Sequence, residues 1–306
     1  MRRLRTVSIT FFIIALVLLA IYFVNRSIYG DKTGPVFHMD SNTIIVSVKD
    51  NEDALLKGLT ALDEADGDVT DSIIVEMISP FTGTGHRIVS YAAFDSDNHV
   101  THTKRELIYK DYEASRFKLS HQLTYPMNAT NLLDGITADD CIDGDLTKNI
   151  RMVSDEEIDT AHVGEYGARL KVMNSAGDVS YLPVTIEIYD ASVRYRKPLL
   201  NLSENVVYVE KGANFDEKEY ISSISINGTD YSLTDERGTY GEISVKQDDA
   251  DNTIGYERVE IESDVDTDAS GYYEVLYSFE DTEFATGTGT ARLYVVVTEG
   301  RMGRNE

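Results

Sequence analysis

The sequence has little of several residue types that particular protein classes need. A single cysteine among 306 residues excludes an internal disulfide framework and a zinc module built from several cysteines. Lys and Arg number 28 against 53 Asp and Glu, and this net charge of −25 argues against a nucleic-acid-binding protein, which needs a basic face for phosphates. Tryptophan is absent and proline occurs five times, but a hydrophobic content of 42% is typical of a folded chain. The length allows two or three domains.

One long apolar run stands at the N-terminus. Residues 7–24 contain no charged residue, glycine or proline, and as a helix they would span about 27 Å, close to the thickness of a bilayer core. Three arginines precede the run, so the positive-inside bias keeps residues 1–6 in the cytoplasm and places the rest of the chain outside the cell. A cleaved signal peptide is the alternative, but the bulky end of the run offers no A-x-A-like cleavage site. The sequence therefore predicts an uncleaved, single-pass signal-anchor helix that attaches the protein to the cell membrane.

Two segments of the chain repeat each other. Residues 55–73 and 132–150 share eleven identities in nineteen ungapped positions, which indicates a tandem duplication. The segments that follow also align, so that residues 86–100 match residues 165–179. A third copy is visible only at its end, where residues 271–281 repeat the apolar alternation of the second copy.

The local periodicity is that of β-strands. Val275, Tyr277 and Phe279 alternate with more polar residues, as in a strand with one buried face. Further strands are predicted at β-branched or aromatic runs bounded by turn residues: 43–48, 184–188, 206–209 and 291–297. A short helical turn is expected around residues 52–59. Short strands in units of roughly 75 to 105 residues predict an all-β protein, with tandem immunoglobulin-like β-sandwiches after one N-terminal transmembrane helix.

The copies also predict how the chain divides. The expected segments are a cytoplasmic tail (1–6), the transmembrane helix (7–24), Ig-like domain 1 (33–113), Ig-like domain 2 (114–192), a divergent Ig-like domain 3 (193–300) and a polar tail (301–306). The joints between the domains contain no glycine and one proline, so they are not flexible tethers. Three sandwiches in series are therefore expected to form a semi-rigid stalk.

The repeated pattern resembles a known module. Both complete copies read A-x-D-x-x-D-G-D-[VL]-T-x-x-I, followed by a strand after a glycine and a short turn before the last strand. This pattern resembles the bacterial immunoglobulin-like domain of the pesticidal-crystal-protein type, which is related to hyaline-repeat and cadherin-like β-sandwiches. The match covers 61–73 and 85–100 in the first copy and 138–150 and 164–179 in the second, whereas the third copy fits only at 271–281 and lacks D-G-D. The resemblance implies a spacer or adhesive module on a bacterial surface.

The acidic loops of the first two copies are the best candidates for a ligand site. Each loop presents three carboxylates around a glycine: Asp63, Asp66 and Asp68 in the first, and Asp140, Asp143 and Asp145 in the second. Oxygen ligands at this spacing suit calcium, and the net charge of −29 on residues 33–306 raises the local concentration of divalent cations. The alternative is a set of Asx-turns, in which the carboxylates accept hydrogen bonds from backbone N–H groups. Both interpretations stay open, and no other cofactor is expected.

Motifs of enzymes are missing. The chain contains no G-x-S-x-G, H-E-x-x-H, P-loop or C-x-x-C, so we expect a protein that is not an enzyme. Fold and location predict a cell-surface stalk or adhesion module whose partner is an extracellular protein or a glycan. The alternative is a non-catalytic accessory or scaffold subunit of an envelope complex. Tyrosines of the third copy are expected either to form a partner or glycan face or to lie in the core: Tyr220, Tyr231, Tyr240, Tyr256, Tyr272 and Tyr273.

Overall fold

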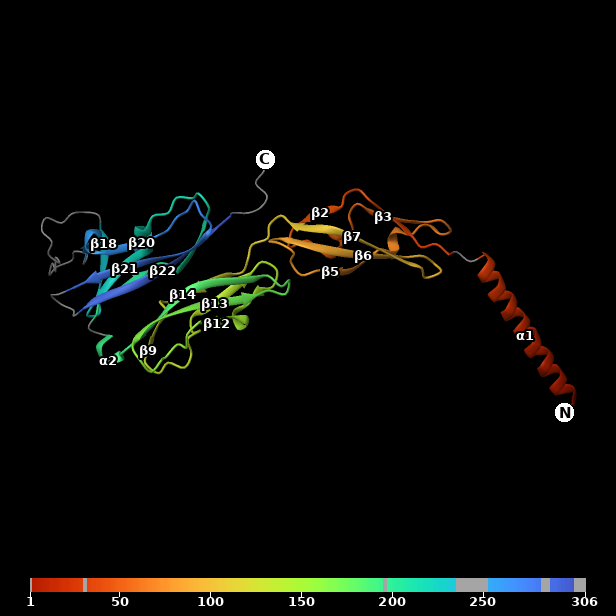
Figure 1. The fold of residues 1–306 in the computed structure, drawn as a ribbon, viewed down its shortest axis with the longest axis horizontal. Coiled ribbons are helices and arrows are strands. Elements are labelled where there is room, and N and C mark those ends of the chain that lie inside the picture. The colour runs from red at the N-terminus through yellow and green to blue at the C-terminus, as the bar shows by residue number, and fades with distance from the viewer. Residues whose placement is uncertain (1, 30–31, 195–196, 235–252, 282–286, 300–306) are drawn as a thin grey trace. The chain divides into compact units, whose positions relative to one another are not determined.

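The computed structural model describes residues 2–29, 32–194, 197–234, 253–281 and 287–299. The chain forms two compact units, Met1–Lys110 and Asp111–Glu306. Outside the N-terminal helix, the regular secondary structure of the described residues is mostly β-strand, as the sequence predicts (Figure 1).

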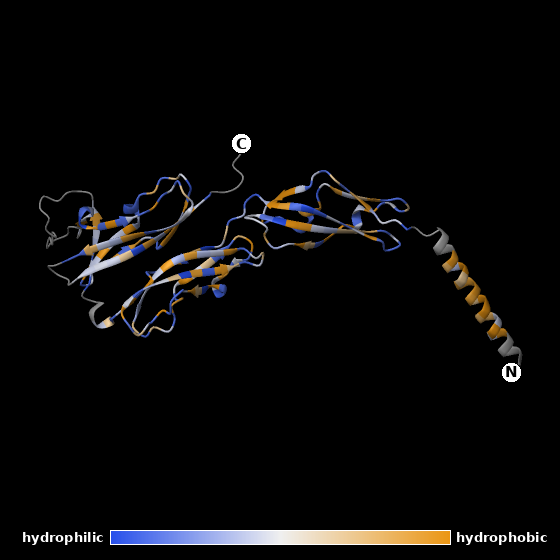
Figure 2. Cartoon of the chain, in the orientation of Figure 1, coloured by the Kyte–Doolittle hydropathy of each residue, from blue (hydrophilic) through white to orange (hydrophobic). Residues whose placement is uncertain are grey.

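Helix α1 (Arg2–Tyr29) contains the apolar run. Its 18-residue window Val7–Val24 is long and apolar enough to cross a membrane, and none of that window is covered by the rest of the protein. Figure 2 shows hydrophobic residues along this part of α1, whereas the strands mix hydrophobic and hydrophilic residues. A helix that is apolar on all sides and uncovered requires an apolar environment, which both a signal-anchor and a signal peptide find in a membrane.

The first sandwich packs a sheet of order β1-β3-β4 against a sheet of order β2-β7-β6-β5. Its strands are β1 (Val36–Met39), β2 (Thr43–Val46), β3 (Leu59–Asp63), β4 (Gly67–Asp68), β5 (Ile74–Ile78), β6 (His86–Phe94) and β7 (Val100–Tyr109). The 3-10 turns are η1 (Glu52–Leu56), where the sequence predicts a helical turn, and η2 (Thr70–Ser72).

The second sandwich repeats this arrangement, with sheets of order β11-β10-β8 and β12-β13-β14-β9. Its strands are β8 (Arg116–Leu119), β9 (Thr124–Pro126), β10 (Ile136–Asp140), β11 (Gly144–Asp145), β12 (Arg151–Val153), β13 (Gly164–Met173) and β14 (Val179–Tyr189), and its 3-10 turn is η3 (Thr147–Asn149). A short helix, α2 (Ala191–Arg194), follows the last strand.

The third sandwich has sheets of order β15-β17-β18-β19 and β16-β22-β21-β20. Its strands are β15 (Leu199–Leu202), β16 (Val206–Glu210), β17 (Ile221–Ile226), β18 (Thr229–Thr234), β19 (Thr253–Gly255), β20 (Glu260–Ser263), β21 (Gly271–Glu280) and β22 (Thr288–Thr298). The 3-10 turns are η4 (Glu217–Tyr220) and η5 (Tyr256–Arg258).

The predicted strands are all strands in the structure. The alternation at Val275, Tyr277 and Phe279 is confirmed, because each of these side chains is at most 1% exposed in β21. Between the two long strands of the hairpins, Asn98 and Gly177 occupy matching positions with φ of 67° and 84°. The repeated turn thus needs a residue that tolerates a left-handed backbone, which glycine and asparagine do at the lowest cost.

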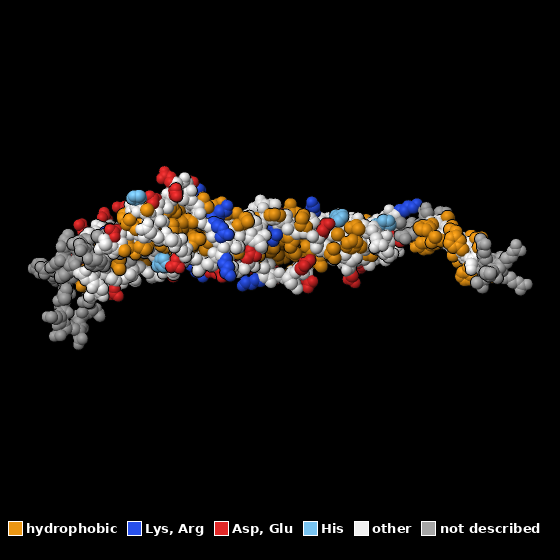
Figure 3. Space-filling model, turned by 90° about the horizontal axis from the view of Figure 1, so that it is seen from below, with side chains coloured by type: hydrophobic (Ala, Val, Ile, Leu, Met, Phe, Trp, Pro, Cys, Tyr) orange, Lys and Arg blue, Asp and Glu red, His pale blue; other side chains and the backbone are white. Residues whose placement is uncertain are grey.

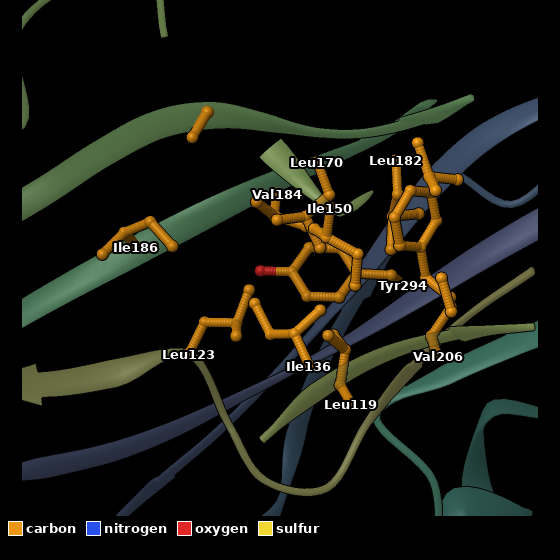
Figure 4. Packing of buried hydrophobic residues seen from close by; sticks show 14 of the residues in the cluster. Leu119, Leu123, Ile136, Ile150, Leu170, Leu182, Val184, Ile186, Val206 and Tyr294 are labelled. Atoms are coloured by element: carbon orange, nitrogen blue, oxygen red, sulfur yellow. The ribbon is translucent and has the colours of Figure 1, made fainter. Parts of the chain in front are cut away.

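Side chains of the third sandwich complete the core of the second. Val206, Tyr294 and Val296 belong to the same buried cluster as Leu119 and Leu182 of the second sandwich. Figure 4 shows Tyr294 beside Leu182, with Val206 next to it. The third sandwich also has a core of its own, built from side chains of β17, β21 and β22. Within residues 111–306 the second and third sandwiches are therefore in direct hydrophobic contact, and the predicted division into three domains stays a prediction.

Hydrogen bonds at this contact fill an open backbone position of the second sandwich. Strand β9 pairs with β14 from Glu187 onward. Thr185 lies two residues earlier on β14, so its outward-facing backbone groups have no partner in β9. The Tyr294 hydroxyl occupies this place, where it accepts from the Thr185 N–H at 3.0 Å and donates to the Thr185 carbonyl at 3.1 Å. The hydroxyl satisfies both backbone groups, which would be costly to bury unpaired.

The third sandwich has the same open position, and the second sandwich fills it. Strand β16 pairs with β22 from Tyr294 onward. Arg292 lies two residues earlier on β22, so its outward-facing backbone groups have no partner in β16. The Gln122 side-chain amide accepts from the Arg292 N–H at 2.7 Å and donates to its carbonyl at 3.0 Å. Side chains thus cross the contact in both directions. Tyr294, Tyr208 and Asn205 of the third sandwich bond to backbone groups of the second, and Gln122 of the second bonds to the third, so we call the two sandwiches a pair.

Candidate binding site

A groove of about 730 Å³ lies between the second and third sandwiches of this pair. Strands β13 and β14 form one wall, and β21 with part of β22 forms the other. Its volume is within the range of small-ligand sites, which measure roughly 300 to 1,000 Å³. The tyrosines in its walls are Tyr166, Tyr272, Tyr273 and Tyr294, and the acidic side chains are Asp155, Glu156, Glu165, Asp264 and Glu274.

Arg292 links one acidic side chain from each wall of the groove. Its guanidinium lies 2.9 Å from Glu165 of the second sandwich and 3.0 Å from Glu274 of the third, and its side chain is only 12% exposed. Burial lowers the pKa of Arg292, but the hydrogen bond and charge of Glu165 and the charge of Glu274 outweigh it and raise the pKa overall. The guanidinium therefore stays charged and holds two carboxylates at fixed positions.

Carboxylates nevertheless outnumber cations at the groove. Arg169 pairs with Asp155 at 3.2 Å, and this pair is solvent-exposed. Glu156 and Asp264 add two further carboxylates to the wall. The groove therefore favours ligands that donate hydrogen bonds or carry positive charge, and it disfavours anions.

Tyr272 is the aromatic side chain that the groove offers most openly, with 50% of its surface exposed. Partial burial and the negative charge of Asp178 raise the pKa of its hydroxyl, so it stays a neutral hydrogen-bonding group. Tyr273 has a structural role as well, because its ring lies over Gly271, where a Cβ would come within 3.3 Å of the ring, and its hydroxyl donates to the Ala269 carbonyl at 2.9 Å.

The sequence predicts that six tyrosines of the third copy either form a binding face or lie in the core, and the structure shows some in each role. Tyr231 is buried, and Tyr220 and Tyr256 pack partly buried against the core of the third sandwich. Tyr240 lies outside the described residues. Of the five tyrosines of this set that the structure describes, Tyr272 and Tyr273 reach the groove.

Sequence reasoning missed the groove residues of the second sandwich and the role of β22. Arg169, Glu165 and Arg292 look like ordinary exposed strand residues in the sequence. A signal was present in β22, because Leu293, Tyr294 and the three valines after it form an unbroken apolar run instead of an alternation. Such a run indicates a strand that is buried on both faces.

The acidic loop of the first sandwich holds backbone turns. Asp63 Oδ1 accepts from the N–H groups of Ala65 and Asp66 at 2.9 and 3.0 Å. Asp66 in turn accepts from the backbone N–H and hydroxyl of Ser96, and Asp68 accepts from the N–H of Thr70 at 3.0 Å. Hydrogen bonds from Thr70 lower the pKa of Asp68.

The loop of the second sandwich repeats these bonds. Asp140 Oδ1 accepts from the N–H groups of Ile142 and Asp143 at 2.8 and 3.0 Å. Asp143 accepts from Ser175, and Asp145 accepts from the Thr147 N–H at 2.9 Å. Hydrogen bonds from the side chain and the backbone of Thr147 lower the pKa of Asp145. The Asx-turn interpretation describes both loops.

Neither loop brings its three carboxylates to a common point. Among the described residues, no group of three or more His, Cys, Asp and Glu side chains is arranged to hold a metal ion. In each loop the three aspartates instead bind three different backbone segments. Calcium binding by these loops stays a prediction.

No protein family profile and no curated protein matches the sequence. Among solved structures, the CBM51-2 and INT domains of ZmpB from Clostridium perfringens, in complex with GlcNAc, are similar at 18% identity and a TM-score of 0.21, over 48% of this chain and 26% of that chain. Human CDH23 EC21-23 is similar at 12% identity and a TM-score of 0.22, over 86% of this chain and 100% of that chain. The chain thus spans about a quarter of the ZmpB structure.

Proposed function

We propose that the chain is a membrane-anchored bacterial cell-surface protein whose tandem Ig-like sandwiches act as a stalk and adhesive module. Helix α1 supplies the anchor, and the paired second and third sandwiches present the binding groove. The observation that carries the adhesive role is the half-exposed Tyr272 in a groove whose polar groups are fixed by Arg292. The proposal contains no catalytic step.

The groove suits a neutral or amino-sugar glycan. A tyrosine ring packs against the apolar C–H face of a sugar, and carboxylates accept hydrogen bonds from its hydroxyl or ammonium groups. Glu165 and Glu274 are held by Arg292, so they do not need to reorganise when a ligand binds. Excess carboxylates repel acidic polysaccharides.

Binding of the full chain to neutral, amino-sugar and acidic glycans on an array tests this ligand class. We expect neutral or amino-sugar glycans to bind, and Tyr272→Ala to weaken binding by at least about tenfold, since a central aromatic contact contributes roughly 1–2 kcal/mol or more. Tyr181→Ala is the matched control, because Tyr181 is 39% exposed on the second sandwich and does not line the groove. Equal binding by both variants, or preference for acidic glycans, would contradict the groove as the site.

The anchor has its own test. Alkaline carbonate extraction of cells should leave the full chain in the membrane fraction, and protease added to intact cells should digest the sandwiches. Release of the chain by carbonate would show a cleaved or peripheral protein and would leave the glycan result unaffected.

A further inference from the structure

The first sandwich carries a surface equivalent to the one by which the third sandwich contacts the second. In both sandwiches a short strand pairs in parallel with the last long strand, and an equivalent hydrogen bond begins the pairing. In the first sandwich the Glu106 N–H donates to the Asn42 carbonyl at 2.9 Å, and in the third the Tyr294 N–H donates to the Asn205 carbonyl at 3.1 Å. The β2–β7 and β16–β22 registers therefore correspond residue by residue. Glu106 of the first sandwich occupies the place of Tyr294.

Apolar residues surround Glu106 on this face. In the register, Ile45 takes the place of Tyr208 and Ile108 that of Val296, while Ile88 lies across the strand from Glu106. The contact residues of the third sandwich are buried against the second sandwich, whereas Ile45 is 63% and Ile88 is 40% exposed. Figure 3 shows such hydrophobic side chains at the surface of the sandwiches.

The second sandwich shows that an apolar outer face is not a requirement of the repeat. Its equivalent sheet, β12-β13-β14-β9, exposes mainly charged side chains on the outer side of β13, including Glu165, Arg169 and Lys171. Exposed clusters of large apolar side chains are uncommon on a solvated surface and indicate a contact with another molecule.

The first sandwich also has an open backbone position beside this face. Lys104 lies on β7, two residues before the first residue that pairs with β2. Thr185 on β14 and Arg292 on β22 hold the same position relative to their pairing with β9 and β16. In the pair, a side chain of the neighbouring sandwich fills each of these positions. Within the described part of the chain, no hydrogen bond to the outward-facing N–H or carbonyl of Lys104 is found.

We propose that this face binds the same face of a second copy of the chain. The first sandwiches of two copies pair about a two-fold axis, with Ile45, Ile88 and Ile108 packed against their counterparts. Glu106 of each copy, in the place of Tyr294, reaches the backbone N–H and ammonium group of Lys104 in the other copy.

Local charge makes a second copy the fitting partner. Two chains with a net charge of −25 repel each other unless the surfaces that meet are balanced. This face is balanced, because the charge of Lys104 offsets that of Glu106, whose carboxylate also lies 3.0 Å from His86 Nδ1. Six residues separate the end of α1 from β1, so in a membrane the first sandwiches of neighbouring copies stay in one layer and meet at high effective concentration.

The mass of the full chain in mild detergent, from sedimentation equilibrium, tests the proposal without using the groove residues. We expect a dimer, twice the 34.2 kDa of the monomer. Ile45→Lys together with Ile88→Lys should weaken it by roughly 100-fold or more, because it places unpaired charges in an apolar contact. Met173→Lys with Tyr181→Lys is the matched control: both residues are exposed on the second sandwich, and the dimer should persist.

A charge exchange identifies the partner face. Lys104→Glu and Glu106→Lys should each give monomers, an equimolar mixture of the two variants should form mixed dimers, and the double variant in one chain should dimerise again. Circular dichroism of each variant shows whether it is folded. A monomeric wild-type chain at about 50 µM, a dimer that survives the two lysines on the isoleucine face, or a mixture that stays monomeric would each overturn the proposal; the second outcome would place the contact in α1 or elsewhere.

Discussion

The first sandwich and the pair formed by the second and third complete their packing in different ways. In the first sandwich, Arg105 bonds within the sandwich: its side chain is 3% exposed and donates to the Lys57 carbonyl at 2.7 Å, to Asp40 at 3.2 Å and to the Thr43 carbonyl at 3.3 Å. In the pair, Tyr294 and its apolar neighbours close the second sandwich from outside. A repeat can therefore complete its core alone or through its neighbour, and the shared D-G-D loop does not determine which.

Removing Tyr294 should have the largest effect on this comparison. Tyr294 is 4% exposed, and burial of its hydroxyl raises its pKa. Tyr294→Ala should destabilise the second and third sandwiches together by about 3–5 kcal/mol, since it leaves a cavity and two unpaired backbone groups. Hydrogen exchange read by mass spectrometry should show lost protection in β8 and β14 as well as β22, with the first sandwich unchanged.

Tyr294→Phe separates packing from hydrogen bonding. This variant keeps the ring and removes the hydroxyl that satisfies Thr185, so a loss of about 1–3 kcal/mol is expected. Lost protection confined to the strands of the third sandwich would show that the two cores are independent after all.

Arg105→Met should act on the first sandwich alone. Methionine keeps the apolar stem but leaves the carbonyls of Lys57 and Thr43 without their donor, so we expect a loss of about 2–3 kcal/mol. Hydrogen exchange should rise in β2, β3 and β7 and stay at the wild-type level throughout residues 111–306. An effect in both units would mean that they are coupled.

The sequence predicts the strands and hairpins well because their signals are local. Alternation at Val275, Tyr277 and Phe279, and turns that accept a left-handed residue, depend on neighbours within a few positions. The contact between the second and third sandwiches is a different kind of property, because Tyr294 bonds to Thr185 of the second sandwich, 109 residues away in the chain. The aspartates of the loops lie between these cases: their spacing is local, but a metal site and a set of Asx-turns use the same residues.

Thermal unfolding with and without calcium distinguishes a metal site from a set of Asx-turns, and we expect a smaller change in stability than for the variants above. Asp143→Asn with Asp145→Asn should lower the thermal unfolding midpoint of the full chain in EDTA, because the amides accept the turn hydrogen bonds more weakly than the carboxylates. Millimolar calcium, with magnesium as control, is then added to both proteins. A calcium-specific rise in wild type that the variant loses would make the loop an ion site; the same response in both would place any ion elsewhere.

The smallest expected effect concerns a difference between the two acidic loops. Asp140 Oδ2 accepts from the Ser115 hydroxyl at 2.6 Å and from Asn174 at 3.2 Å. Its counterpart Asp63 is 6% exposed, and its Oδ2 is buried without a hydrogen-bond partner in the described structure. Pro35 stands where the second sandwich has Ser115, since each directly precedes the strand that pairs with the loop strand.

Pro35→Ser should therefore supply the missing donor to Asp63. A hydrogen bond to a buried carboxylate stabilises by about 1–2 kcal/mol, and the loss of proline costs roughly 0.4–1 kcal/mol through the greater freedom of the unfolded chain, so the net gain stays below about 2 kcal/mol. Pro35→Ala has the same backbone effect without a hydroxyl and is the matched control. Urea unfolding should find the serine variant more stable than the alanine variant; equal stability would show that Asp63 does not use the donor, and that the two loops differ in more than the residue before the strand.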